Sequence, residues 1–439
     1  MTTIRHFMAA AIICLVLAAN LWFGLTAVLA RQSRFELAPG AQVSDLYPRW
    51  LGTRNLILHG ANPYTPAATL ANERGYYGRA RRPDETALDV SGFQGFSYPL
   101  SVAVVLAPVS LLPFPLVKAG ATVGLIVAIF WATATWARLV GWPRTPARRW
   151  LLALGVLACL PAIDLISLQQ LAGLSIVLIA LVALGLRRGW WVAAGVLLAL
   201  ATIKPQVVAL LALGLLIWAA HDVRRRWRFV AAFAATLLLL LAVSFALQPE
   251  WLGWFLAQTR LYATENTLTS PLTTLIPGLP AQVVVGGSVV VLTLAAFWTR
   301  CCAPNDATAV PLDAIALSIA STIVLLPAAA TYNDTFLLFP ALVIARDATR
   351  HRSMVNRLLT RSALALGVVL LALTALQPME TALGLSISPS LQVQLLGAGY
   401  AVLSVPVWLA LVGQQLARRW RVSEKCQVVD DLHSKSSTT

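Results

Sequence analysis

Apolar stretches separated by short polar connectors make up most of the chain. Thirteen apolar segments follow one another between residues 8 and 415. Runs such as Met8 to Ala30 and Phe229 to Leu247 are long enough to cross a bilayer, because a hydrocarbon core of about 30 Å takes about 20 helical residues. Helices and closed barrels are the only structures that satisfy their own backbone polar groups in lipid. The pattern therefore predicts a bundle of transmembrane helices.

The connectors between the apolar segments fall into two classes. Arg-rich connectors begin at 187, 221, 346 and 418, and the positive-inside bias predicts that they are cytoplasmic. The connectors between them carry polar residues at 164–170, 204, 248–280, 332–334 and 377–392. These connectors then all lie on the extracytoplasmic face, and a long loop over 31–97 faces the same side.

Thirteen crossings cannot both start and end in the cytoplasm, so one segment must be re-entrant or merged. We expect the Pro-rich segment 98–113 to be a half-span, which leaves about twelve true spans. The predicted fold is an all-α polytopic membrane protein with one transmembrane domain over 1–421. Short amphipathic helices are expected in the loop 31–97, and residues 422–439 are expected to form a polar, disordered cytoplasmic tail.

Composition agrees with a membrane protein and argues against two other classes. The chain is 58% hydrophobic and 12% charged, with a mean hydropathy of +0.75, whereas soluble domains are about 25% charged. The net charge of +15 comes from arginines clustered at the ends of apolar runs, which indicates contacts with membrane lipids and not nucleic acid. The five cysteines show no CxxC spacing, so we expect no metal site, no disulfide framework and no cofactor.

The stretch "QVSDLYPRWLGTRNLILHGANPYTP", residues 42–66, carries the first candidate chemistry. Asp45 is the only acid between Glu36 and Glu73, and it fits either a general base or a helix N-cap. Arg49 and Arg54 fit contacts with a phosphate or with lipid headgroups. Tyr64 closes a turn-forming Asn-Pro-Tyr sequence and offers a ring on which a sugar could stack.

Three later polar breaks carry the remaining candidates. Lys204, in "TIKPQ", lies between two apolar runs, where a lysine indicates a functional site by default; the alternative is a lysine that reaches water beside a helix-breaking proline. "PAIDLISLQQ" offers substrate contacts, with Gln169 and Gln170 as the main candidates. "TYNDTF" offers Tyr332, Asn333 and Asp334 as contacts for an acceptor, with an N-cap as the alternative for the last two.

Four stretches together resemble the polytopic glycosyltransferases of family 87 in the GT-C superfamily, which includes bacterial polyprenyl-phosphate-mannose-dependent alpha-mannosyltransferases. They are "SDLYPRWLGTRNLILHGANPY", "FSYPLSVAVVLAPVSLLP", "AAGVLLALATIKPQVVALLALGLLIW" and "LLPAAATYNDTFLLFPALVI". The second stretch has Leu100 where the family has a second proline. The resemblance implies a GT-C-type bundle whose first extracytoplasmic loop carries the catalytic acid, here Asp45.

The resemblance also implies the reaction. We expect an inverting transfer of a hexose, with mannose as the first choice, from a polyprenyl-phosphate sugar to a glycolipid or glycan acceptor. The site would face the extracytoplasmic side of the plasma membrane, and Lys204 with loop arginines would bind the donor phosphate. The alternatives are a GT-C enzyme for arabinofuranose or glucose, a lipid or solute transporter, and a catalytically inactive scaffold.

Overall fold

The computed structural model describes residues 37–81, 93–265, 270–301, 310–326, 330–350 and 404–413, with four isolated positions between 18 and 25. All regular structure in these ranges is helical, as the sequence predicts. The predicted first span, residues 31–36 and 82–92 of the 31–97 loop, the apolar segment 362–377 and the C-terminal tail lie wholly or mostly outside the described residues.

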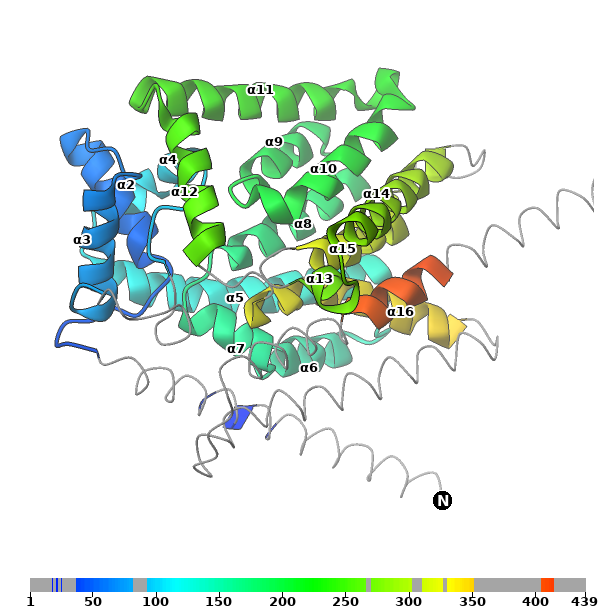
Figure 1. Cartoon of the computed structure of the whole chain (residues 1–439). Coiled ribbons are helices and arrows are strands. Elements are labelled where there is room, and N and C mark those ends of the chain that lie inside the picture. Colours follow the sequence, from blue (N-terminus) through cyan, green and yellow to red (C-terminus); the bar gives the residue numbers. More distant parts are fainter. Residues whose placement is uncertain are drawn as a thin grey trace, which may run out of the picture.

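Two helices of the first loop pack against each other and begin and end at clear sequence signals (Figure 1). Helix α2 (Tyr47–His59) has a proline in its first turn and ends at Gly60, which adopts the left-handed conformation (φ 63°) that glycine tolerates best. Helix α3 (Pro66–Tyr77) is capped by the Thr65 hydroxyl, which accepts from the amide N–H of Ala68 over 3.2 Å.

Helix α4 (Ser101–Ser110) packs against α2 and has 10 residues. Near the start of α4, the hydroxyl of Tyr64 donates to the Tyr98 carbonyl oxygen over 2.8 Å. At its end, Arg54 Nη1 donates to the carbonyl oxygens of Ser110 and Leu111 over 2.9 and 3.0 Å. Both ends of α4 therefore contact the first loop.

The remaining helices form the bundle. Their bounds are α5 (Phe114–Val140), α6 (Pro146–Leu157), α7 (Leu160–Ser167), α8 (Ala172–Arg187), α9 (Trp191–Ala201), α10 (Pro205–Ala220), α11 (Val223–Leu247), α12 (Trp251–Glu265), α13 (Pro271–Leu275), α14 (Leu279–Cys301), α15 (Leu312–Leu325), the 3-10 helix η1 (Thr331–Leu337) and α16 (Leu338–Arg350). Helices α11, α9, α8, α5 and α6 are stacked in that order from top to bottom in Figure 1.

Three of these helices, α5, α11 and α14, are long and apolar enough to span a membrane. The pair α6 and α7 passes the same test as one span bent by 62°, and six further apolar helices have 10–17 residues. The described residues therefore establish an all-helical membrane-type architecture, and they provide fewer full-length spans than the twelve expected from the sequence.

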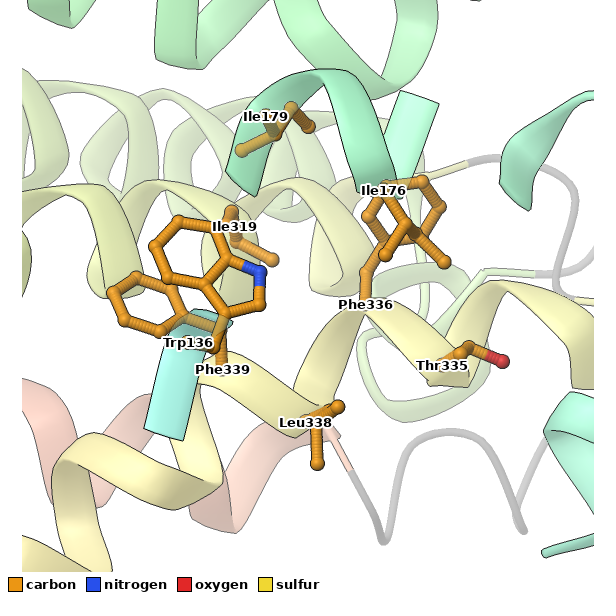
Figure 2. Close-up of a pocket in the computed structure, with 8 residues that line it drawn as sticks. All are labelled: Trp136, Ile176, Ile179, Ile319, Thr335, Phe336, Leu338 and Phe339. Atoms are coloured by element: carbon orange, nitrogen blue, oxygen red, sulfur yellow. The ribbon is translucent and has the colours of Figure 1, made fainter. Parts of the chain in front are cut away.

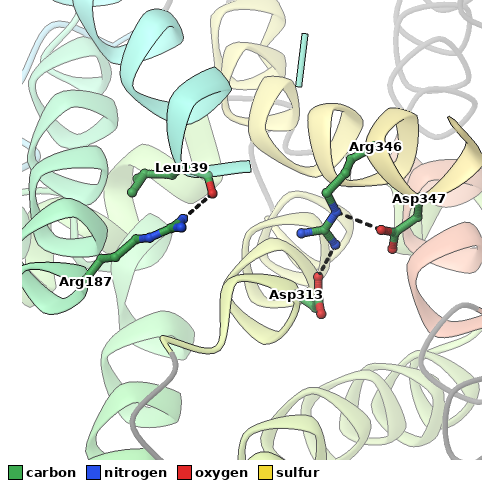
Figure 3. Close-up of polar contacts among 5 residues, drawn as sticks. All are labelled: Leu139, Arg187, Asp313, Arg346 and Asp347. Atoms are coloured by element: carbon green, nitrogen blue, oxygen red, sulfur yellow. Dashed lines mark hydrogen bonds and ion pairs between the residues drawn. The ribbon is translucent and has the colours of Figure 1, made fainter. Parts of the chain in front are cut away.

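The bundle has two chemically different ends. At the end that we call the arginine end, Arg346 donates over 2.7 Å to both Asp313 and Asp347, and Arg187 donates to the Leu139 carbonyl oxygen (Figure 3). The end that we call the site end is formed by the α7–α8, α9–α10 and α15–η1 junctions. Helix α8 connects the two ends, since it starts beside Gln170 and finishes at Arg187.

Candidate active site

Asp45 lies directly before α2 and is fixed through its backbone. Its amide N–H donates to the carbonyl oxygen of Leu168, at the α7–α8 junction, over 2.9 Å. The N-cap of α2 is Leu46, and no side chain caps this helix. The alternative reading of Asp45 as an N-cap is therefore wrong, and its carboxylate is used elsewhere.

Both oxygens of the Asp45 carboxylate accept hydrogen bonds. The Tyr76 hydroxyl, on α3, donates to Oδ1 over 3.4 Å, and Gln170 Nε2 donates to Oδ2. Asp45 itself is half-buried. Donors that face a carboxylate favour its ionised form, so these two contacts suit an acid that has to accept a proton.

Arg49, one helical turn after Asp45, places a cation beside the acid. Its Nη1 donates to the backbone carbonyl oxygen of Asp45 over 3.0 Å, and its guanidinium lies 4.7 Å from the centroid of the Tyr98 ring. The Nε atom is buried without a hydrogen-bond partner in the described part of the chain. Guanidinium N–H groups bind phosphate and carboxylate oxygens well, so Arg49 has a donor available for an anion.

Lys204 is enclosed at the α9–α10 junction with only 4% of its surface exposed. Its ammonium donates to Asn333 Oδ1 over 3.2 Å and lies 4.8 Å from the centroid of the Tyr332 ring. Burial lowers the pKa of this ammonium to about 7; the charge of Arg49 also lowers it, and the charge of Asp45 raises it. Lys204 therefore does not extend to water, which was the alternative to a functional role, and it belongs to the same group of charges as Asp45.

Three tyrosines surround these charges. Burial raises the pKa of Tyr98 to about 12, and the charges of Arg49 and Asp45 also act on it. Burial likewise raises the pKa of Tyr262, on α12, where the same two charges act. The pKa of Tyr332 lies well above 10, chiefly because of burial. All three hydroxyls are therefore protonated at neutral pH and can donate hydrogen bonds.

We call this assembly the acid–cation cluster. It comprises Asp45, Arg49, Tyr76, Tyr98, Gln170, Lys204, Tyr262, Tyr332 and Asn333. Its members come from α2, α3, α12, η1 and four connecting segments, so the fold brings together residues almost 290 positions apart.

The two adjacent glutamines at the α7–α8 junction have different partners. Gln170 reaches Asp45, whereas Gln169 Nε2 donates to Thr122 Oγ1 on α5 over 3.1 Å and to the carbonyl oxygens of Ile166 and Ser167. Gln169 Oε1 is buried and has no partner among the described residues. Gln170 thus belongs to the cluster, and Gln169 holds the junction to α5.

Three other predicted site residues, Arg54, Tyr64 and Asp334, are not members of the acid–cation cluster. Arg54 is bound to the end of α4, as described above. Tyr64 is 1% exposed and lies edge-on to Phe96 with centroids 5.3 Å apart, which leaves no open ring face for a sugar and supports the turn role. Asp334 is buried on η1, where burial raises its pKa well above the usual 3.8 and favours the neutral acid.

Neither Asn333 nor Asp334 caps a helix. The N-cap of η1 is Ala330, and no side chain caps this helix. Asn333 instead lies within η1 and accepts from Lys204. The N-cap alternative for this segment is therefore wrong for Asn333, whose side chain joins the cluster.

An apolar recess lies next to η1 in the bundle interior (Figure 2). Trp136 and Phe339 stack there with ring centroids 3.8 Å apart. The other lining residues are Ile176, Ile179, Ile319, Thr335, Phe336 and Leu338. Apart from Thr335, this lining carries little polar chemistry, so the reactive groups of the site end are those of the acid–cation cluster.

No group of three His, Cys, Asp or Glu side chains within the described ranges could hold a metal ion. The cations that the cluster itself supplies are the side chains of Arg49 and Lys204.

Sequence reasoning missed three members of the cluster. Tyr76 lies in the basic, aromatic stretch "RGYYGRARRPDE", and Tyr98 lies in the "FSYPL" entry to α4, but neither tyrosine has a sequence neighbour that indicates a contact with Asp45 or Arg49. Tyr262 lies in the long connector 248–280 and carried no local signal. Its position depends on how α12 crosses the first loop, where Gln258 Nε2 donates to the Tyr64 carbonyl oxygen over 2.6 Å.

A protein-family model described as Glycosyltransferase family 87 matches residues 96–327, more than half of the chain. The matched range includes Tyr98, Gln170 and Lys204, whereas Asp45 and Tyr332 lie outside it. No curated protein and no solved structure matches the chain.

Proposed function

From the premise that the chain belongs to glycosyltransferase family 87 and is a membrane glycosyltransferase, we propose the reaction that it catalyses. The protein transfers a hexose, with mannose as the first choice, from a polyprenyl-phosphate sugar to a glycolipid or glycan acceptor. The observation that carries the proposal is the acid–cation cluster, in which one carboxylate lies among two cations and several hydroxyl donors at one end of an apolar bundle.

In the proposed reaction, Asp45 is the general base. It removes the proton from the acceptor hydroxyl while that oxygen attacks the anomeric carbon of the donor sugar. The bond between the anomeric carbon and the phosphate oxygen breaks, and the phosphate leaves with the electron pair. A single carboxylate is enough for this direct displacement, so the anomeric configuration inverts.

Arg49 and Lys204 bind the leaving phosphate. The guanidinium of Arg49 carries a buried N–H that has no partner among the described residues, and the ammonium of Lys204 is held in place by Asn333 and the Tyr332 ring. Cations that are already positioned where negative charge develops stabilise the transition state without reorganisation. A phosphate carried by a lipid also suits a site between apolar helices.

The proposal places the cluster on the extracytoplasmic face of the plasma membrane. Arg187 and Arg346 lie at the opposite end of the bundle, and the first turn of α11 carries further arginines, including Arg224 and Arg225. Connectors rich in arginine stay in the cytoplasm, so the site end faces outward.

Sugar transfer by the purified full-length protein in nanodiscs tests this function. Synthetic polyprenyl-phosphate-mannose is supplied with a panel of glycolipid and oligosaccharide acceptors, and native protein is compared with Asp45→Asn. We expect transfer by the native protein and a loss of at least about a hundredfold in the variant, because a general base contributes about 10²–10⁴ to the rate.

Donors carrying arabinofuranose or glucose are run in parallel. Transfer from one of these instead of mannose corrects the sugar and keeps the mechanism. Equal transfer by native protein and Asp45→Asn contradicts the role of Asp45, and no transfer from any donor contradicts the proposed reaction.

A further inference from the structure

We propose that Gln170 and Tyr76 are positioning residues that fix the Asp45 carboxylate for proton abstraction, and that Gln170 does not bind substrate. This inference rests on the proposed function, because it takes Asp45 as the base. It assigns to Gln170 a different role from the substrate contact that its place in the sequence suggested.

The first argument is geometric. Gln170 and Tyr76 approach the two carboxylate oxygens from different elements, the α7–α8 junction and α3. The backbone N–H of Asp45 is bound to Leu168, two residues before Gln170. The carboxylate is thus held at its backbone and at both oxygens, which limits its rotation about χ1 and χ2.

The second argument comes from backbone conformation. Within the described ranges, Val43 (φ 41°) and Gln169 (φ 49°) are the only residues other than glycine with positive φ. This conformation is unfavourable for side-chain-bearing residues and most of all for a β-branched one such as Val43. Val43 lies two residues before Asp45, and Gln169 directly precedes Gln170. Strained residues therefore occur on both sides of the Asp45–Gln170 contact, as is typical of functional sites.

The backbone conformation of Gln169 sets different directions for its own side chain and for the side chain of Gln170. With Gln169 in the left-handed region, its side chain is directed to Thr122 on α5, while Gln170 reaches Asp45. On the other side, the N–H of Val43 donates to the Tyr76 carbonyl oxygen over 3.1 Å, which places the segment before Asp45 next to the tyrosine that binds Oδ1.

The two donors also act on the charge of the acid. N–H and O–H groups that face a carboxylate stabilise its ionised form, so the loss of either donor makes Asp45 accept its proton at higher pH. Among the described residues, other titratable or charged groups near the acid are Arg49, Tyr98, Lys204, Tyr262 and Tyr332, and Asp164 acts in turn on Tyr332.

Matched pairs of neighbours provide the test. Gln170→Met and Tyr76→Phe remove the donors to Asp45, while Gln169→Met and Tyr77→Phe alter the adjacent residues, whose partners are Thr122 and Gln94. Transfer from polyprenyl-phosphate-mannose is measured against pH, with the folded fraction of each variant determined by circular dichroism and size-exclusion chromatography.

For Gln170→Met we expect kcat to fall about tenfold or more with KM unchanged, and the acidic limb of the pH–rate profile to move up by about one pH unit. Tyr76→Phe shows the same pattern with a smaller effect, because its contact is longer. The two controls keep the native acidic limb. A substrate contact at Gln170 would instead raise KM.

A double-mutant cycle adds a readout that does not depend on activity. If Gln170 acts through Asp45, the shift in Tm caused by Gln170→Met becomes smaller in the Asp45→Asn background. A native acidic limb in Gln170→Met, a raised KM, or additive Tm shifts overturns the inference while the proposed function stands. Undiminished transfer by Asp45→Asn contradicts the proposed function itself, and the inference falls with it.

Discussion

At the residue scale, two arginines of the same helix serve different neighbours. Arg49 and Arg54 are five positions apart on α2, which separates them by about 140° around the helix. Arg49 contacts Asp45 and the Tyr98 ring, whereas Arg54 binds the carbonyl oxygens that end α4. The helix therefore uses one cation in the cluster and one to hold α4 in place.

Replacing each arginine by methionine separates these roles. We expect Arg49→Met to lower kcat/KM for the donor by about tenfold to a hundredfold, because a charge-assisted hydrogen bond to the phosphate is lost. Arg54→Met leaves kcat/KM per folded molecule near the native value and lowers Tm. Steady-state kinetics and thermal unfolding in the same detergent measure both quantities, and equal kinetic losses in the two variants would contradict the division.

Asp334 gives a pH-dependent prediction for stability. Because its pKa is raised in the folded protein, the folded state keeps a proton that the unfolded chain releases near pH 4. Stability from this group is fully present below that pH and is lost as pH rises toward the folded pKa, by up to about 1.4 kcal/mol per pH unit. Asp334→Asn, which resembles the neutral acid, should therefore lose less Tm than native protein between pH 4 and pH 8. Parallel curves would contradict the neutral state of Asp334.

At the scale of elements, small residues decide how closely helices approach. In lipid, apolar burial does not drive helices together, and close packing across small residues matters more. A Cβ atom added to Gly195 on α9 would lie 2.3 Å from the Phe229 carbonyl oxygen and 2.8 Å from the Phe233 amide nitrogen on α11. The α9–α11 contact thus depends on the missing side chain.

Replacing either of two helix glycines by alanine compares a tight helix–helix contact, at Gly195, with a looser one, at Gly185. We expect Gly195→Ala to destabilise the protein by about 1–3 kcal/mol, because α9 and α11 have to move apart. At Gly185 the added Cβ would lie 3.4 Å from the Ala194 side chain, and the better helix propensity of alanine offsets any small shift. Thermal unfolding of both variants measures the two effects. A Tm for Gly195→Ala at or above that of Gly185→Ala would contradict the predicted clash between α9 and α11.

At the scale of the whole molecule, the bundle separates two kinds of charge. The arginine end holds an ion-paired group around Arg346, and the site end holds the acid–cation cluster. Helices α2, α3 and α12 stand across the site end in Figure 1, at a steep angle to the stacked helices of the bundle. This arrangement puts the first loop and α12 over the junctions that carry the reactive side chains.

Much of this organisation was predictable from the sequence. The apolar pattern predicted the helices, and the polar breaks predicted that Asp45, Lys204 and Tyr332 would gather on one side. Contacts across long stretches of chain were not predictable, because no local signal places Tyr262 beside Arg49. The different roles of Gln169 and Gln170 were hidden as well, since they depend on one left-handed backbone conformation. The prediction of about twelve spans is not confirmed, because several apolar helices among the described residues are short or bent.

The enclosure of Lys204 has a consequence for how the enzyme responds to ionic strength. Mobile ions screen charges through water, and they act weakly on charges that water does not reach. With 4% of its surface exposed, the Lys204 ammonium would attract a donor phosphate almost independently of dissolved salt. We expect the donor KM to change less than about twofold between roughly 0.05 and 0.5 M NaCl. With the proposed extracytoplasmic orientation, recognition of the donor would then stay constant while the salt concentration outside the cell changes.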